Sequence, residues 1–233
     1  MRGSLLFLSF VLTGVSGYAH AGGTVAVRSE AVSSSSAEAH VFKKGTAPDP
    51  GAAPNVRNVS QAHEQPQNCW LTVAQKYNIP TYLLFAIAMV ESELNPTAVN
   101  RNTNKSTDFG YMQINDSWNP TLKKYGIEPK DLANPCVSIH VGAWILADNF
   151  YRMGYSWKAI GAYNARDDYK RWVYAQKVYA MHDMLVKWSD AYHATYLDKF
   201  GTSPEHVPKP PEPWIKYART NANVMIKTGG RGN

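Results

Sequence analysis

The feature that most constrains the fold is an unbroken apolar run at residues 82–90, which is followed directly by Glu91. A helix of this composition is apolar all round, so it is stable only when other elements cover every side of it. On helical spacing Glu91 continues the buried row that contains Leu84 and Ile87. Burial makes a carboxyl group costly to ionise, so we expect a raised pKa, in the range of a general acid. The alternative is that Glu91 turns into solvent beside Glu93.

The region around this run, residues 66–190, shows helical periodicity almost throughout. Apolar residues recur at intervals of three and four, as they do on the buried face of an amphipathic helix. The sequence therefore predicts a mainly α domain. Its three clearest apolar stripes are Trp70, Val73, Ala74 and Tyr77; Val137, Val141, Trp144 and Ile145; and Trp172, Ala175, Tyr179 and His182.

Capping and turn residues divide this domain into segments. Thr81 is the predicted N-cap of the helix that contains the apolar run. Gly154 is predicted to end one helix and Ser156 to cap the next, while Asp167 suits a helix N-terminus. Residues 95–109 are rich in Asn, Thr, Ser and Pro, which predicts turns and a small hairpin.

The two ends of the chain differ in composition from the domain at 66–190. An apolar run over residues 5–15 and small residues ending in Ala-His-Ala are typical of a cleavable secretory signal, which we place at 1–21. Residues 22–65 are rich in Ala, Ser, Gly and Pro and are predicted to be a flexible linker. Residues 191–233 are predicted to form a short helical extension and a Pro-rich, polyproline-like tail.

The chain contains two cysteines, Cys69 and Cys136. In an exported protein two cysteines are most simply one disulfide. A metal site would need further ligands, and the histidines are scattered, so neither a metal nor another cofactor is predicted. The net charge of +6 includes no basic block, so nucleic acid is not an expected partner. The longest later apolar stretch, 83–90, is too short to span a bilayer, so we expect no stable membrane insertion.

Three short blocks follow one another along the domain: ESELNP at 91–96, DFGYMQIN at 108–115 and GAYNA at 161–165. With Cys69 and Trp70 in front of them, they resemble the signature blocks of the lytic transglycosylase family. The resemblance implies a lysozyme-like α+β single domain, mainly α with a small hairpin region. Within this family the chain is most similar to the small transglycosylases that open peptidoglycan for conjugation, pilus and secretion machines. The implied partners are glycan strands and components of such a machine, and the implied location is the periplasm or outside the cell.

The resemblance also implies roles for individual residues. Glu91 would be the single catalytic acid and base, cleaving the bond between N-acetylmuramic acid and N-acetylglucosamine and leaving a 1,6-anhydro sugar. Gly110 is expected to permit a tight turn at the cleft edge. Ser92 would orient the glutamate, Gln113 and Asn115 would bind sugar amide groups, and Tyr163 and Asn164 would close the cleft. As purely structural residues, Tyr163 would belong to the core and Asn164 would cap a helix.

Residues 91–115 are also similar to animal-type lysozymes. There an aspartate matching Asp108 is the nucleophile and a tryptophan matching Trp118 lies in the cleft, which would make the chain a retaining hydrolase. We favour the transglycosylase interpretation because Tyr163 and Asn164 belong to that pattern. A third hypothesis is a catalytically silent module that binds glycan or supports assembly. The presence of Glu91 at a predicted buried position argues against it.

Overall fold

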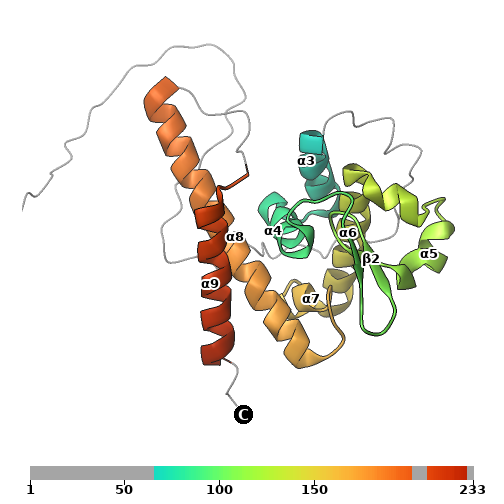
Figure 1. Cartoon of the computed structure of the whole chain (residues 1–233). Coiled ribbons are helices and arrows are strands. Elements are labelled where there is room, and N and C mark those ends of the chain that lie inside the picture. The colour runs from blue at the N-terminus through green and yellow to red at the C-terminus, as the bar shows by residue number, and fades with distance from the viewer. Residues whose placement is uncertain (1–65, 201–208, 230–233) are drawn as a thin grey trace, which may run out of the picture. The chain divides into compact units, whose positions relative to one another are not determined.

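The computed structural model describes residues 66–200 and 209–229 (Figure 1). The predicted export signal at 1–21 and linker at 22–65 lie outside this part of the chain. The elements are α3 (Pro66–Tyr77), α4 (Thr81–Ser92), β1 (Val99–Arg101), β2 (Thr107–Phe109), β3 (Ile114–Asn115), the 3₁₀ helix η1 (Asp116–Trp118), α5 (Asn119–Lys123), the 3₁₀ helix η2 (Pro129–Ala133), α6 (Pro135–Met153), α7 (Trp157–Gly161), α8 (Asp168–Phe200) and α9 (Glu212–Gly229).

Helix α4 is the central buried helix that the apolar run predicts. It contacts both α3 and α8, and Leu84 and Ile87 are fully buried within it. The prediction of Thr81 as its N-cap is wrong, because Pro80 occupies that position and Thr81 is the first helical residue. The extended backbone of Pro80 presents its carbonyl oxygen to the N–H groups of Leu83 and Leu84 and so begins the helix.

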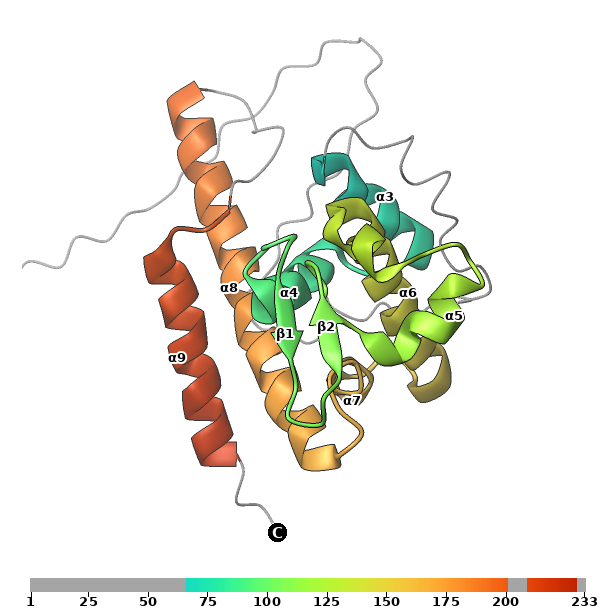
Figure 2. The ribbon, with the colours of Figure 1, turned by 45° about the vertical axis from the view of Figure 1, so that its right-hand side comes forward.

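A small antiparallel sheet follows α4. Strands β1 and β2 form the predicted hairpin, with Asn100 opposite Asp108, and β3, which was not predicted, pairs with the other edge of β2 through Asn115. Figure 2 shows this hairpin beside α4. Asp108 therefore lies in the central strand with an asparagine opposite it on each side. The described elements confirm the predicted mainly α fold with a small hairpin region.

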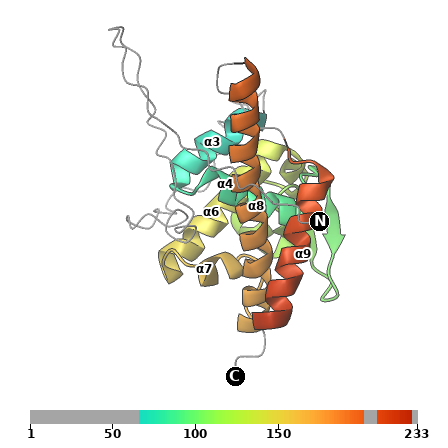
Figure 3. The ribbon, with the colours of Figure 1, turned by 90° about the vertical axis from the view of Figure 1, so that its left-hand side faces the viewer.

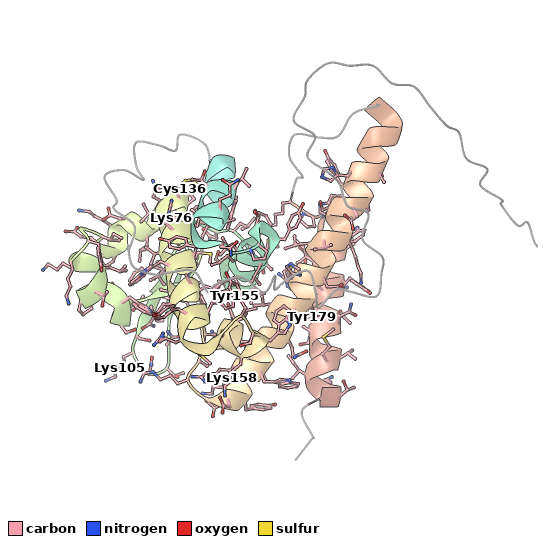
Figure 4. The ribbon with its side chains drawn as sticks, turned by 180° about the vertical axis from the view of Figure 1, so that it is seen from behind. Lys76, Lys105, Cys136, Tyr155, Lys158 and Tyr179 are labelled. Atoms are coloured by element: carbon pink, nitrogen blue, oxygen red, sulfur yellow. A yellow bond between two sulfur atoms is a disulfide. The ribbon has the colours of Figure 1, made fainter. Side chains whose placement is uncertain are left out.

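The predicted disulfide joins Cys69 in α3 to Cys136 in α6, with the two Cα atoms 5.6 Å apart. Figure 4 labels Cys136 where α6 begins, beside α3. Both cysteines are buried. The Asn134 side chain caps α6 by accepting hydrogen bonds from the backbone N–H groups of Cys136 and Val137. The bond thus fixes the start of α6 against the helix that precedes α4.

The other predicted helix ends are confirmed. Gly154 ends α6 with a positive φ of 73°, and the Ser156 hydroxyl caps α7 by accepting from the N–H of Ala159. The Asp167 carboxylate accepts from the backbone N–H of Lys170 at the start of α8. These caps set where α8, the longest described helix, begins.

The apolar stripe predicted on α8 is wrong in its phase. Of its four members, Trp172, Ala175, Tyr179 and His182, only Ala175 is buried, and the fully or nearly buried face instead holds Tyr174, Val178, Met181 and Leu185. The reason is that α8 is covered on more than one side, by α4, α7 and α9. Because the apolar residues of these buried faces alternate along the sequence, the sequence pattern does not show which residues belong to which face.

Residues 212–229 form helix α9, so the prediction of a Pro-rich tail is wrong for this segment. Ile215, Ala218 and Ala222 are buried on the helix face, and the ring of Trp214 packs against Trp188 of α8, with centroids 5.5 Å apart. Pro213 lies in the first turn of α9, where a missing N–H costs no helical hydrogen bond. Figure 3 shows α9 lying along α8.

The boundary predicted at residue 190 falls inside α8, which continues without a break to Phe200. In the described ranges, no helix combines the length and the apolar character that crossing a bilayer requires.

Candidate active site

Glu91 lies in the last turn of α4, between two adjoining hollows in the protein surface. The first, which we call the hairpin-side hollow, has a volume of about 560 Å³ and is also lined by Asp108 and Gln113. The second, the α8-side hollow, has a volume of about 290 Å³ and is also lined by Tyr174. Glu91 and Asn164 line both. The two hollows thus meet at Glu91 and Asn164, and we refer to the pair together as the groove.

The Glu91 carboxyl group accepts a hydrogen bond of 2.5 Å from the Tyr174 hydroxyl. Burial raises the pKa of Glu91 to about 7. The Tyr174 hydrogen bond and the Lys177 charge oppose this rise, and the negative charge of Asp108 adds to it. Glu91 can therefore exchange a proton near neutral pH, as expected from its place at the end of a buried row. Tyr174 was missed because it lies 83 residues away and belongs to no recognised block.

Tyr163 packs beside Tyr174, with the two rings stacked at 16° and their centroids 6.5 Å apart. Its hydroxyl donates to the carbonyl oxygen of Met112 at 2.8 Å. Burial and the nearby carboxylates of Glu91 and Asp108 raise the pKa of the Tyr163 phenol well above its usual value. Tyr163 therefore remains a neutral donor that ties the end of α7 to the loop after β2.

That loop, residues 110–113, is held from three sides. Besides Tyr163, the Ser138 hydroxyl of α6 accepts from the N–H of Met112. The Ser92 hydroxyl donates to the carbonyl oxygen of Tyr111 at 2.8 Å. Ser92 thus holds the loop against the end of α4, which differs from the predicted role of orienting the glutamate directly.

Two glycines allow this close packing. Gly110 has a φ of +73°, and a Cβ there would lie 2.1 Å from the carbonyl oxygen of Leu132. Gly142 of α6 faces the Met112 side chain, which a Cβ would approach to 2.7 Å. Gly110 therefore permits the tight turn that the sequence predicted.

The Asp108 carboxylate is engaged through both of its oxygens. Oδ1 accepts from the amide of Asn115 at 2.6 Å, and Oδ2 accepts from the amide of Asn102 at 2.8 Å. Asn115 also donates to Ser106 and accepts from the N–H of Ser117, which makes it the N-cap of η1. Asn115 therefore holds Asp108 inside the sheet through its amide nitrogen, and the atom left for the predicted contact with a sugar amide is its oxygen, which also caps η1.

The remaining predicted binding residues fall in different places. Gln113 lines the hairpin-side hollow, but its amide nitrogen donates to the carbonyl oxygens of Ala98 and Gly110, so its own oxygen is the atom left for a ligand. Trp118 packs edge-on against Trp144 of α6, with centroids 5.5 Å apart. That contact places Trp118 in the packing of η1 on α6.

The chain leaves α4 through two consecutive left-handed residues, Glu93 with φ 53° and Leu94 with φ 65°. Such conformations are costly for residues with side chains. Arg219 of α9 binds the Glu93 carboxylate, and Lys209 donates to the Glu93 carbonyl oxygen. The C-terminal helix thus supports the turn that immediately follows Glu91. Among the described residues, no three His, Cys, Asp or Glu side chains gather as a metal site would require.

Comparison with known proteins identifies the domain. Residues 68–181 match the family model described as the transglycosylase SLT domain. The chain is 43% identical over 128 residues to Invasion protein IagB of Salmonella typhi, which covers 52% of this chain and 79% of the relative. It is 42% identical over 117 residues to Protein IpgF of Shigella flexneri, covering 48% and 77%.

Invasion protein IagB of Salmonella typhimurium strain SL1344 is 49% identical over 105 residues, which is 45% of this chain and 66% of that relative. The family match contains α4, the sheet, α6, α7 and the first part of α8, including every residue that lines the groove. The chain therefore belongs to the transglycosylase SLT domain family.

Proposed function

We propose that this protein is an exported lytic transglycosylase that cleaves the bond between N-acetylmuramic acid and N-acetylglucosamine in peptidoglycan. The observation that carries the proposal is the carboxyl group of Glu91, whose pKa burial raises to about 7, at the place where the two hollows meet. The membership of the chain in the transglycosylase SLT domain family supports the same chemistry.

The mechanism uses one proton and no water. The protonated Glu91 gives its proton to the bridging oxygen as the bond from that oxygen to the muramic C1 breaks. The substrate's own acetamido oxygen stabilises the positive charge at C1. The glutamate then removes the proton of the muramic 6-hydroxyl, whose oxygen bonds to C1 and closes the 1,6-anhydro ring. Glu91 ends the cycle protonated, as it began.

Tyr174 tunes this cycle. Its hydroxyl stabilises the ionised form of Glu91, which is the form that must accept the proton from the 6-hydroxyl. Tyr163 and Ser92 keep the loop at 110–113 in place, and Asn164 lines the groove on both sides of the glutamate. The chain's contribution is therefore positioning and proton transfer.

A retaining hydrolase is the second candidate function. The observation that favours it is that Asp108 lines the same hollow as Glu91. In such an enzyme Asp108 would bond to C1, and water would later release the sugar with a reducing end.

Mass spectrometry of the products decides between the two. Purified peptidoglycan digested by the full chain is expected to yield anhydromuramic ends, one water lighter than the hydrolytic products. Reducing muramic ends would establish the hydrolase instead. Absence of any cleavage, with folded protein and retained binding to peptidoglycan, would establish the silent module.

Tyr174→Phe is expected to move the alkaline limb of the pH–activity profile upward. The Tyr174 hydrogen bond lowers the pKa of Glu91, so its loss raises that pKa above about 7 and keeps the general acid protonated to higher pH. The measurement is the pH dependence of kcat/KM. Tyr169→Phe is the matched control, because Tyr169 lines the same hollow with its side chain 60% exposed. An unchanged limb in Tyr174→Phe would contradict this role.

The protein's place in the cell is part of the proposal. The predicted signal at 1–21 supports export to the periplasm or beyond. One relative is named an invasion protein, which supports the proposal that this protein acts together with an envelope-spanning apparatus. Such an apparatus would need a local opening in the wall. Fractionation of cells that express the full chain tests the export, with mature protein beginning near residue 22 as the expected result.

A further inference from the structure

The two halves of the groove differ in charge. The hairpin-side hollow contains no lysine or arginine among its lining residues, and its two ionisable groups are Glu91 and Asp108. The α8-side hollow is lined by two lysines, Lys170 and Lys177, and its single acidic residue is Glu91. A polymer lying along the groove would therefore meet a cationic wall on one side of the glutamate.

Helical spacing puts both lysines on the face of α8 that meets Glu91. Lys170, Val173, Tyr174 and Lys177 follow the i, i+3, i+4, i+7 pattern of a single helix face. The Tyr174 hydrogen bond fixes that face toward the glutamate. With a rise of about 1.5 Å per residue, the two lysines begin about 10 Å apart along the helix, one on each side of Tyr174.

These lysines form no ion pair with any residue of 66–200 or 209–229, although acids lie close in sequence. The Asp168 carboxylate is paired with Arg171 and Lys158. The Asp167 carboxylate is used to cap α8. The Lys177 charge acts on Glu91 itself and favours its ionised form. The cationic wall is thus available to an anion that a ligand brings.

We propose that Lys170 and Lys177 form a carboxylate-binding subsite, which selects glycan strands that carry acidic side groups over neutral ones. The inference rests on the proposed function and names the part of the substrate that the α8-side hollow contacts. In peptidoglycan such carboxylates come from two sources, the stem peptide or the lactyl group of a muramic acid without a peptide. Both place an anion on a side arm of the sugar, and Lys170 and Lys177 are the two lysines among the residues that line the α8-side hollow.

The test compares the double variant Lys170→Gln/Lys177→Gln with Lys216→Gln in the full chain. Glutamine removes the charge and keeps most of the side chain, and Lys216 is an exposed lysine of α9 outside the groove lining. Three polymers are used: intact peptidoglycan, amidase-treated glycan that retains only lactyl carboxylates, and neutral chitin. Binding is measured by cosedimentation at two salt concentrations, and cleavage by initial rates.

The double variant is expected to bind acidic polymer about 2- to 10-fold more weakly, with a smaller salt dependence, as for two exposed charge contacts. The loss should appear in KM. Because removal of the Lys177 charge also raises the pKa of Glu91, kcat is compared on the plateau of each variant's pH profile, where little change is expected. A loss on intact but not on amidase-treated polymer assigns the stem peptide, because the lactyl carboxyl is amide-bonded wherever a peptide is attached. A loss on amidase-treated polymer alone assigns the lactyl carboxylate, and a loss on both shows that the subsite accepts either anion. Binding to chitin should be unaffected.

If the double variant binds each of the three polymers as tightly as Lys216→Gln does, the proposed subsite is overturned. A wild-type chain that binds acidic polymer through these lysines but never cleaves it would defeat the proposed function and leave the subsite standing. Binding and cleavage therefore test the two proposals separately.

Discussion

Replacing Glu91 with glutamine is expected to reduce peptidoglycan cleavage by about 10²- to 10⁴-fold, the range that general acid–base catalysis contributes. The amide has the same shape, and its oxygen can still accept the hydrogen bond from Tyr174. It has no acidic proton for the bridging oxygen and no carboxylate for the 6-hydroxyl. Since the proposed mechanism uses this one group twice, no other side chain replaces it.

Glu93→Gln is the matched control. Glu93 lies two residues further along, is exposed, and contacts Arg219 of α9. Its loss removes an exposed ion pair worth about 0.2–1 kcal/mol, so cleavage should stay within a few-fold of wild type. Circular dichroism and thermal unfolding establish that both variants fold. Well-folded Glu91→Gln protein with substantial activity would move catalysis to another residue.

The position of Glu91 was predictable because its cause is local. An apolar run on every face of α4 requires a buried helix, and the carboxyl group that ends the run inherits that environment. The disulfide was equally predictable from the sequence, since the chain contains only two cysteines. In the first case a few adjacent residues are enough for the prediction, and in the second the number of cysteines is enough.

Tyr174 could not be predicted in the same way. Its contact with Glu91 depends on how α8 packs against α4, and the apolar pattern of α8 is ambiguous because α4, α7 and α9 all cover it. The prolines near residue 210 concealed α9 for a related reason. A proline in the first turn is compatible with a helix, and only the burial of Ile215 on α8 distinguishes a packed helix from an extended tail.

The polar residues of the first two blocks illustrate a further limit. Asn115 and Ser92 were predicted to serve the substrate or the glutamate, but their side chains make hydrogen bonds within the protein. A polar residue in a recognised block contributes either to ligand binding or to the shape of the site. The residue type alone does not distinguish the two, because both need the same donors and acceptors.

Asp108→Asn is expected to reduce cleavage by about 10- to 100-fold, through damage to the hairpin. Each Asp108 oxygen accepts from an asparagine amide, so the substitution leaves a new N–H group facing a donor of Asn102 or Asn115. Losing one such bond to a charged group costs about 1.5–3 kcal/mol. The loss of the Asp108 charge also lowers the pKa of Glu91, so the alkaline limb of the pH profile should move to lower pH.

A paired substitution separates this structural loss from the loss of a nucleophile. In Asp108→Asn/Asn115→Asp the amide and carboxylate exchange places, so the contact between β2 and β3 again joins a donor to an acceptor. The Ser106 hydroxyl, which accepts from Asn115 in the wild type, must then donate to the new carboxylate. The new carboxylate at position 115 can still cap η1 through the N–H of Ser117. The double variant should therefore recover most of the activity that Asp108→Asn loses, and it should still produce anhydromuramic ends.

In a retaining hydrolase both variants would be as inactive as Glu91→Gln, because the exchange leaves no carboxylate in the central strand to attack C1. Recovery in the exchanged pair would thus assign Asp108 to holding the hairpin, and equal inactivity with reducing-end products from wild type would assign it to the chemistry.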